Sequence, residues 1–539
     1  MVTNNFHIKS IQKKGDGCGL MEAIKQRVGK GLRDPGTFRY FYLLDLLFCS
    51  VCFINVPANL LKVVFFPWAA VLIYQRFCAN HNVYKVRYWG ILLLFLAVGA
   101  LTTILHIWDN FFYNVMILFH VAMCFFLFYG MHAEPNKNKI KSEIQRLMKT
   151  VVVLTTAFSV IGLLIVLFCV RIYVWDHVLG LMDNRFTGVY INPNPAAFAS
   201  VVGVLFCHFL WKKRKENGKR VIPLWLGISC LASNLFALLL SDSNGSLVFL
   251  LAYAGVLLFY WLFRIGKQKK FSARAIFKRG AALVAIVLVA SFGMLGVRYV
   301  CQSGVGALVS GREQIVLGDT INPTAQPGEN GEPAPKPESS SVGQVVIGRK
   351  DNPDVSSGRF DSLGKAFQLF IREPVLGIGQ GNIVEYGERY LDEGFLFEDL
   401  HNGYVTILVS YGIVGFLLVM AFLFVLARRM YAGLHKNLHK GKLQLPLLFA
   451  MLGAYCVYSL FDITLLLDVN FMVVIFWLLL GYATTYLLQY ETRFEVITSQ
   501  PFSLWKQKAP VKVPLYLLPT GRSYSSLRLM TKDMKKRDA

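Results

Sequence analysis

Residues 398–427 read EDLHNGYVTILVSYGIVGFLLVMAFLFVLA, a short polar start followed by a run with no charged side chain from residue 402 onward. A helix of about 20 apolar residues crosses the hydrocarbon layer of a bilayer, which is about 30 Å thick. The run is long enough to span a membrane. His401 stands directly before it, after two carboxylates, and is either a reactive group at a membrane surface or a polar residue that begins a helix.

The rest of the chain repeats this pattern of long apolar blocks. Of the 539 residues, 55% are hydrophobic and only 16% are charged, whereas soluble domains carry about 25% charged residues. The mean hydropathy is +0.47. These values exclude an ordinary soluble protein and predict an all-α polytopic membrane protein embedded in a lipid bilayer.

We predict about twelve transmembrane helices from these apolar blocks. They are placed at residues 40–57, 60–77, 88–106, 112–130, 149–175, 194–211, 222–240, 246–263, 281–298, 402–427, 445–466 and 469–488.

The net charge of +24 comes from basic residues in short loops and at both ends of the chain. Basic loops stay on the cytoplasmic side of a membrane, and no basic loop falls on the opposite side of the predicted spans. The charge therefore reflects topology, and we predict no nucleic-acid partner. The predicted parts are a cytoplasmic N-terminal segment (1–39), nine spans (40–298), a large extracytoplasmic loop (299–401), three spans (402–488) and a cytoplasmic basic tail (489–539).

The large loop has two parts. Residues 324–341, TAQPGENGEPAPKPESSS, are rich in Pro, Gly, Glu and Ser, a composition that cannot bury a core and predicts a flexible linker. After the linker, apolar residues recur at helical spacing. These residues are Phe360, Leu363, Phe367, Phe370 and Ile371. We predict an amphipathic helix here, ended by Pro374.

Three polar side chains near the predicted outer surface are candidates for chemistry, because ionisable groups close to membrane spans are functional by default. The imidazole of His401 can take a proton from a hydroxyl at neutral pH; the alternative is a helix-entry residue bonded to backbone. Arg185 and Arg359 suit bidentate binding of phosphate. Their alternatives are an interface anchor and a solvated helix charge, respectively.

Other features of the same region carry weaker signals. Gly377 and Gly379 lie in GIGQGN, which we interpret as a flexible turn because no strand precedes it, as a phosphate-binding loop would require. Asp242, Asp462 and Asp468 are weaker candidates. The ten cysteines fall mostly in apolar blocks, and we predict no metal site and no cofactor.

Several short patterns occur in a fixed order along residues 183–425. Arg359 and Leu363 frame RFDSL, and Pro374, Gly377 and Gly379 give Pro-x-x-Gly-x-Gly. His401-Asn402 precedes Gly412 by nine intervening residues, and an earlier segment contains Arg185, Gly188, Asn192, Pro193 and Asn194. In these patterns the chain resembles the O-antigen ligase/polymerase superfamily, membrane glycosyltransferases of lipid-linked oligosaccharide pathways. Two positions depart from the family pattern: Gly415 replaces a threonine, and Asn244 stands where relatives often have arginine.

The resemblance implies a metal-independent, inverting transfer of a glycan from an undecaprenyl-diphosphate carrier to a sugar hydroxyl, on the outer face of the bacterial cytoplasmic membrane. It implies His401 as the base and Arg185 and Arg359 as diphosphate-binding residues. The supporting residues would be Asn402, Leu363, Gly412, Gly377, Gly379 and Asn194. The acceptor is a glycan or glycolipid, and polymerase and ligase remain equally open.

Two other classes of function fit the twelve predicted spans. The first is a secondary transporter or a lipid-linked glycan flippase that does no transferase chemistry. Such proteins place charged or broken-helix sites near the middle of the membrane, whereas the candidate charges here gather beside the long acidic loop. The second is a non-catalytic membrane scaffold, in which His401 has no role.

Overall fold

The computed structural model describes residue 29, residues 31–79, 83–175, 177–212, 220–263 and 272–310, residues 312, 315–317, 347 and 348, and residues 359–391, 400–437 and 444–488. All of them belong to one unit of the chain, which ends at Glu491. The predicted linker at 324–341 and the basic tail at 489–539 lie outside the described residues, as does most of the predicted basic N-terminal segment.

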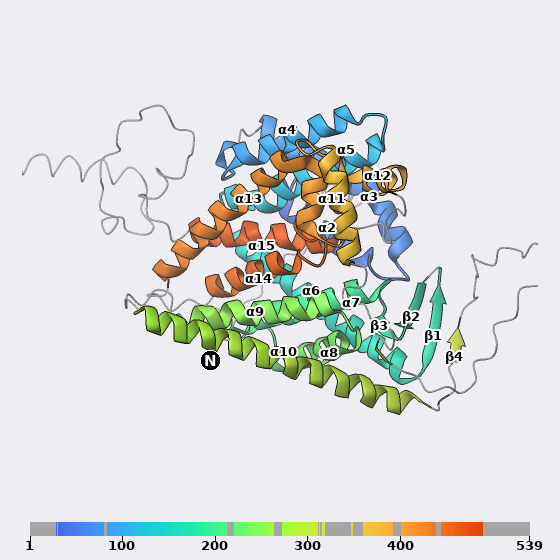
Figure 1. Ribbon diagram of the computed structural model, residues 1–539. Coiled ribbons are helices and arrows are strands. Elements are labelled where there is room, and N and C mark those ends of the chain that lie inside the picture. The colour runs from blue at the N-terminus through green and yellow to red at the C-terminus, as the bar shows by residue number, and fades with distance from the viewer. Residues whose placement is uncertain are drawn as a thin grey trace, which may run out of the picture. The chain divides into compact units, whose positions relative to one another are not determined.

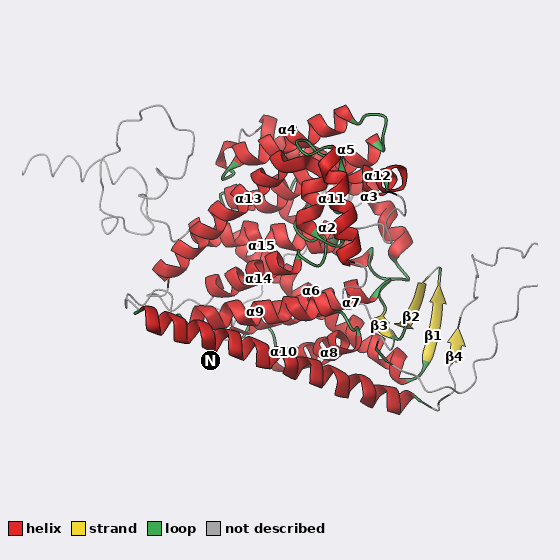
Figure 2. Cartoon of the chain, in the orientation of Figure 1, coloured by secondary structure: helices red, strands yellow, loops and turns green. Residues whose placement is uncertain are grey.

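Helices make up most of the described part (Figures 1 and 2). In the first half they are α2 (Pro35–Phe48), α3 (Asn55–Tyr74), α4 (Trp89–Leu105), α5 (Phe111–Met123), α6 (Lys137–Leu167), α7 (Pro193–Lys212), α8 (Leu224–Leu240) and α9 (Asn244–Leu262). In the second half they are α10 (Ala273–Val309), α11 (Arg359–Arg372), α12 (Ile383–Tyr390), α13 (Gly403–Asn437), α14 (Gln444–Tyr458) and α15 (Phe471–Leu488). Two π-helical stretches, η1 (Gln75–Ala79) and η3 (Cys124–Phe128), continue α3 and α5, and the 3₁₀ turn η4 (Tyr129–Ala133) follows η3.

The structure does not confirm the count of twelve spans. In the described part of the chain, eight helices are long and apolar enough to cross a membrane: α3, α5, α6, α7, α9, α10, α13 and α15, with η1 extending α3 and η3 and η4 extending α5. The predicted spans at 40–57, 88–106, 222–240 and 445–466 correspond to the shorter helices α2, α4, α8 and α14.

The block at 445–466 shows why apolar length overestimated the helix. Helix α14 ends at Tyr458, and the chain continues as turns through residue 470, where Ile463, Leu465, Leu466 and Leu467 are buried. Irregular backbone is tolerated at membrane depth when protein surrounds it. Hydropathy records that these residues avoid water but not whether they are helical.

A small sheet corrects the expectation of an all-α fold (Figure 2). The strands are β1 (Val170–Val174), β2 (His177–Met182), β3 (Arg185–Gly188) and β4 (Ile315–Leu317), in the order β3-β2-β1-β4. Strand β1 pairs antiparallel with β2, with Val174 opposite His177, and parallel with β4. The predicted span at 149–175 therefore stops at Leu167, because the branched and aromatic residues of VRIYV favour a strand.

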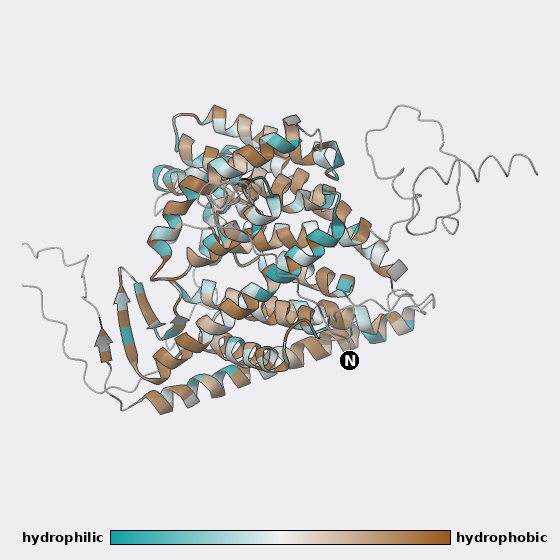
Figure 3. Cartoon of the chain, turned by 180° about the vertical axis from the view of Figure 1, so that it is seen from behind, coloured by the Kyte–Doolittle hydropathy of each residue, from teal (hydrophilic) through white to brown (hydrophobic). Residues whose placement is uncertain are grey.

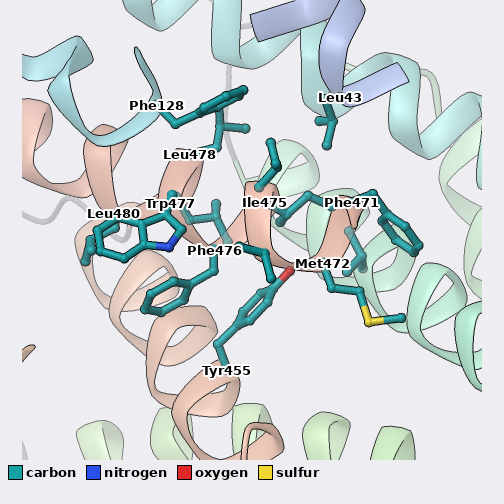
Figure 4. Close-up of a cluster of buried hydrophobic side chains, with 14 of the residues drawn as sticks. Leu43, Phe128, Tyr455, Phe471, Met472, Ile475, Phe476, Trp477, Leu478 and Leu480 are labelled. Carbon is teal, nitrogen blue, oxygen red and sulfur yellow. The ribbon is translucent and has the colours of Figure 1, made fainter. Parts of the chain in front are cut away.

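Helix α15 forms the centre of the apolar core. Its residues from Phe471 to Leu487 are all buried, as expected for a helix that is apolar on every side. Figure 4 shows its side chains packed against Leu43, Phe128 and Tyr455 from other segments. Trp477 stacks on Phe422 of α13 and donates its indole N–H to the carbonyl of Leu465 at 2.7 Å, so this large side chain is fully satisfied.

Helix α10 has the opposite environment. Many of its apolar side chains point away from the rest of the protein, and its ribbon is largely brown in the hydropathy view (Figure 3). Among them Phe277, Val289, Phe292, Tyr299 and Val300 are exposed. Exposed apolar surface on this scale marks contact with lipid or another protein. With eight membrane-length helices in the described part, lipid is the simplest partner for this face.

A buried group of charges ties α2 to α6 and to the turns between α5 and α6. The guanidinium of Arg39, which is fully buried, contacts Glu143 at 2.6 Å and Glu134 at 2.8 Å. It also donates to the carbonyl of Leu127 in η3, while Arg76 of η1 donates to Glu134 and to Phe126. The two arginines thus satisfy carbonyls in a stretch where α-helical bonding is lost.

Replacement of Arg39 by alanine is expected to destabilise the fold by about 3–5 kcal/mol, because Glu143 would stay buried without its cation. Thermal unfolding of the purified protein in nanodiscs measures the effect. Lys139→Ala is the matched control, since Lys139 and Asp34 form an ion pair whose lysine is half exposed and such pairs contribute about 0–1 kcal/mol. Equal shifts in Tm for both variants would contradict the assignment.

Candidate functional site

Helix α13 is broken in its first half. Tyr411 (φ −127°, ψ 18°) and Gly412 (φ 62°, ψ −170°) leave the helical conformation. A break removes backbone hydrogen bonds on both sides, and unpaired N–H and C=O groups inside an apolar protein each cost several kcal/mol. The chain must therefore supply other partners at this level.

Residues 374–379 supply those partners from the segment that follows α11. The N–H groups of Ile378 and Gly379 donate to the carbonyls of Val409 and Ser410 at 3.1 and 2.9 Å. In the other direction, the N–H of Ile413 donates to the carbonyl of Pro374 at 2.8 Å. The loop segment and the broken helix therefore pair through backbone, as two strands would.

The glycines in both segments are required by this close approach. A Cβ atom on Gly412 would lie 2.2 Å from the carbonyl oxygen of Val375, and one on Gly377 would lie 2.5 Å from that of Val409. Both glycines also have positive φ, 62° and 71°, which side chains disfavour. The interpretation of Gly377 and Gly379 as a flexible turn was wrong: both are fixed between packed segments.

Gly415 lies one turn after the break in α13 and packs against Tyr411, one of the two residues at the break. A Cβ atom there would lie 2.5 Å from the Cβ of Tyr411, which is buried and packs edge-on against Phe95 with ring centroids 5.3 Å apart. A threonine at this position would displace Tyr411. This departure from the family pattern therefore fits the local packing of this chain.

Segment 374–390 is also attached to the turn between α4 and α5. Thr102 donates its hydroxyl to the carbonyl of Leu376 at 2.7 Å. The Tyr386 hydroxyl lies 3.0 Å from both His106 Nδ1 and Asp109 Oδ2, and burial together with the Asp109 carboxylate raises the pKa of Tyr386 above its usual value. The Tyr386 hydroxyl therefore stays protonated at neutral pH and can donate a hydrogen bond. It joins α12 to the turn between α4 and α5, and both segments were predicted to lie on the outer side of the membrane.

His401 stands where α13 begins, in the left-handed conformation with φ 46°. The next residue, Asn402, caps the helix: its side-chain oxygen accepts from the N–H groups of Tyr404 and Val405 at 3.1 and 3.2 Å. Asparagine is among the best residues at this position. The cap is thus supplied by Asn402, while Glu398 and Asp399, the two carboxylates that precede His401, lie outside the described residues.

The residues around His401 come from three segments. Gly403 donates its N–H to the carbonyls of Ser459 and Asp462 at 2.8 and 3.1 Å, which joins the start of α13 to the segment after α14. Leu400 is buried in a cluster with Ala366 and Leu369 of α11. His401 is half-buried between these contacts, so its position is fixed by packing on both sides of the backbone.

Arg185 and Asn194, two residues of the same sequence pattern, lie together. The guanidinium of Arg185, at the start of β3, donates to Asn194 Oδ1 at 3.0 Å and to the carbonyl of Ser241 at 3.0 Å. Asn194 is in the first turn of α7, and Ser241 ends α8. Arg185 therefore joins three elements at one point, in a partly buried position.

The start of α9, which follows the turn that Arg185 contacts, and the start of α13, which follows His401, both contact residues 458–462. Gly245, which follows the Ser241 turn, packs so closely on Tyr458 and Phe461 that a Cβ atom would lie 3.2 Å from the first ring and 3.3 Å from the Cβ of the second. Asn402 donates to the carbonyl of Leu460 at 3.3 Å. Residues 458–462 therefore join the start of α9 to the start of α13. Within them Asp462 accepts a hydrogen bond from the Tyr458 hydroxyl at 2.9 Å.

The predicted amphipathic helix is α11, but its packed face differs from the prediction. Ser362, Ala366 and Leu369 are buried, whereas Leu363, Phe367 and Ile371 are exposed. Arg359 is the first residue of α11, and its side chain lies outside what the structure describes. The apolar spacing identified the helix correctly, yet it did not show which apolar residues face protein and which face outward.

In the described ranges, no three His, Cys, Asp or Glu side chains are grouped closely enough to hold a metal ion. One cation near the site was absent from the sequence prediction: Arg298, the last residue of the predicted span 281–298, lies 3.0 Å from Asp242. The feature of the sequence that could have identified Arg298 is its charge at the end of an apolar block, where ionisable groups are often functional.

Comparison with known protein families gives one finding. Residues 229–420 match a family whose description is O-antigen ligase; this range runs from α8 through the Ser241 turn, α10 and α11 to the broken helix α13. The match confirms the resemblance to the O-antigen ligase/polymerase superfamily. No curated protein matches the chain.

Replacement of Gly412 by alanine is expected to disrupt the pairing between α13 and residues 374–379, at a cost of at least about 1–3 kcal/mol for the strained backbone alone. A lower Tm and new protease cleavage near residues 374–390 would register it. Gly293→Ala on α10 is the control, since nothing lies within 4 Å of its Cβ position and alanine favours a helix. Retained stability and protease resistance in Gly412→Ala would contradict this account.

Proposed function

We propose, with the O-antigen ligase match of residues 229–420 as premise, that the chain transfers a glycan from an undecaprenyl-diphosphate carrier to a sugar hydroxyl. The match supports glycan transfer of the ligase type and membership of cell-envelope polysaccharide synthesis. The donor, the acceptor and the location on the outer face of the bacterial cytoplasmic membrane are the finer parts of the proposal. The observation that carries it is that residues 458–462 contact both the start of α13, directly after His401, and the start of α9, directly after the turn to which Arg185 donates.

In this proposal His401 removes the proton of the acceptor hydroxyl as that oxygen attacks the anomeric carbon of the donor. The new carbon–oxygen bond forms while the bond to the diphosphate breaks, and the electron pair leaves with the diphosphate. A single displacement of this kind inverts the anomeric configuration. General-base assistance of this type contributes about 10²–10⁴-fold to a rate, and the fixed backbone around His401 keeps its imidazole oriented.

Arg185 is proposed to bind the diphosphate leaving group. A guanidinium forms charge-assisted hydrogen bonds with phosphate oxygens, and these strengthen as negative charge develops on the leaving group. The contacts of Arg185 with Asn194 and Ser241 orient it before substrate arrives. Arg359 is proposed as a second cation, brought by α11, whose buried face packs with Leu400 beside His401. This arrangement stabilises charge without a metal ion.

The broken helix α13 also bears on the alternative of a transporter. Transporters use the ends of broken helices to bind substrates and ions near the middle of the membrane. Here the carbonyls of Val409 and Ser410 and the N–H of Ile413 are bonded to residues 374–379. These groups are therefore occupied by the protein's own backbone, which favours a structural break over a transport site.

The decisive experiment uses the full-length protein in nanodiscs with a synthetic undecaprenyl-diphosphate oligosaccharide and candidate acceptors. Mass spectrometry of the products detects new glycosidic bonds. We expect wild-type transfer and a loss of about 10²–10⁴-fold in kcat for His401→Ala and His401→Gln. The control is His177→Ala, which changes a histidine of β2 outside the proposed site and should leave kcat unchanged.

Three outcomes separate the alternatives. Undiminished transfer by His401→Ala would remove the base mechanism while leaving the transferase class in place. Movement of the glycan lipid across a vesicle bilayer with no new glycosidic bond would favour the flippase. Elongation of a lipid-linked acceptor identifies a polymerase, whereas transfer to an acceptor on another carrier identifies a ligase.

A further inference from the structure

Two arginines from distant parts of the chain meet the same turn. Residues 241–244 join α8 to α9, and Arg185 of β3 donates to the Ser241 carbonyl at its beginning. Arg298 of α10 reaches its other end, where Nη1 lies 3.0 Å from Asp242 Oδ1 and 2.8 Å from Asn244 Oδ1. The turn itself has no basic side chain, so both cations come from outside it.

Arg298 lies on the one face of α10 that packs against the protein. Gln302, Val305 and Val309 follow it at helical spacing and are buried, while its neighbours Tyr299 and Val300 are exposed and apolar. Gln302 donates to the carbonyl of Leu239 at 3.1 Å, which fixes α10 against the end of α8. The guanidinium of Arg298 is therefore held at the turn by the packing of its helix.

The contacts of Arg298 leave part of its guanidinium available. Its hydrogen bond to Asn244 and its ion pair with Asp242 both use Nη1. Within the described residues Nε and Nη2 donate to no protein acceptor, and they are not buried without a partner. Two guanidinium groups from other elements, Arg185 and Arg298, therefore contact this one turn. A guanidinium with free donors that shares a turn with a second guanidinium is suited to an anion with several oxygens.

Asn244 is the residue of the turn to which the Arg298 guanidinium donates its hydrogen bond. Its side chain is exposed, and it begins α9, where the helix dipole also favours an anion. The turn itself carries the Asp242 carboxylate and no basic side chain. The Arg298 guanidinium contacts the Asn244 side chain directly, so a cation from another helix stands at the first residue of α9.

We propose that Arg298 is a diphosphate-binding residue of this chain, acting together with Arg185 across the 241–244 turn. The inference rests on the proposed function, since it assumes a diphosphate leaving group. It goes beyond that function in assigning a binding role to a residue of α10, and it makes the position of α10 a requirement for donor binding.

The test measures steady-state transfer by the full-length protein in nanodiscs, with the lipid-linked donor varied. Arg298→Ala is expected to lower kcat/KM for the donor at least 10-fold, and Arg298→Lys to lose less because it keeps the charge. Arg298→Gln keeps a polar side chain beside Asp242 and Asn244 without the charge, and is expected to be as impaired as Arg298→Ala. Arg279→Ala, at the other end of α10 where Arg279 donates to the Leu262 carbonyl, is the control with unchanged kcat/KM.

Charge relocation gives the sharpest result. The double variant Arg298→Ala/Asn244→Arg moves the arginine from α10 to the turn. It should recover most of the lost kcat/KM, since the side chain at position 244 is exposed and a longer one has room there. Inhibition by inorganic pyrophosphate is a second readout: its inhibition constant should rise at least 10-fold in Arg298→Ala and fall back in the double variant.

The outcomes distinguish this inference from the proposed function. If the wild type makes no glycosidic bond, the proposed function is wrong, and the diphosphate-binding role of Arg298 is then wrong as well. If the wild type is active and Arg298→Gln matches it, or the double variant stays as impaired as Arg298→Ala in folded protein of normal Tm, Arg298 only fastens α10 to the turn and the inference is overturned.

Discussion

The backbone pairing between residues 374–379 and the broken helix α13 is the constraint on which the rest of the site depends. Four hydrogen bonds replace those lost at Tyr411 and Gly412, in a region where unpaired backbone is costly. The pairing fixes where α11 and α12 lie, because they flank the paired segment. It also fixes the first turns of α13, at whose beginning His401 stands.

A second connection gathers the polar groups of the site. Residues 458–462 leave α14 as irregular backbone and contact the start of α13 on one side and the start of α9 on the other. A continuous helix would have buried its carbonyls in its own hydrogen bonds. The interruption exposes the carbonyls of Ser459 and Leu460, to which Gly403 and Asn402 bond. The candidate site therefore lies where α13 and α14 are interrupted, and at each interruption another segment supplies the missing backbone hydrogen bonds.

The charged groups divide into two kinds by what surrounds them. Arg39 and Glu143 are buried and satisfied by one another, so they hold α2 against α6 and have no free capacity for a ligand. Arg298, by contrast, keeps donors that face no protein acceptor in the described part of the chain. This difference in remaining hydrogen-bond capacity separates a structural arginine from one suited to bind an anion.

The sequence by itself determined the membrane class, because apolar length and the placement of basic loops follow directly from the cost of burying charge. Its short patterns also singled out Arg185, Asn194, Gly377 and Gly412 as residues of interest. Tertiary structure alone decided that these glycines are packed between other segments, that the helices in four apolar blocks have only 14 to 17 residues, that β1, β2 and β3 follow α6, and that Arg298 reaches Asn244. These outcomes depend on which groups form hydrogen bonds with partners far away in the sequence. The hydropathy of a sequence does not show which distant residues are paired.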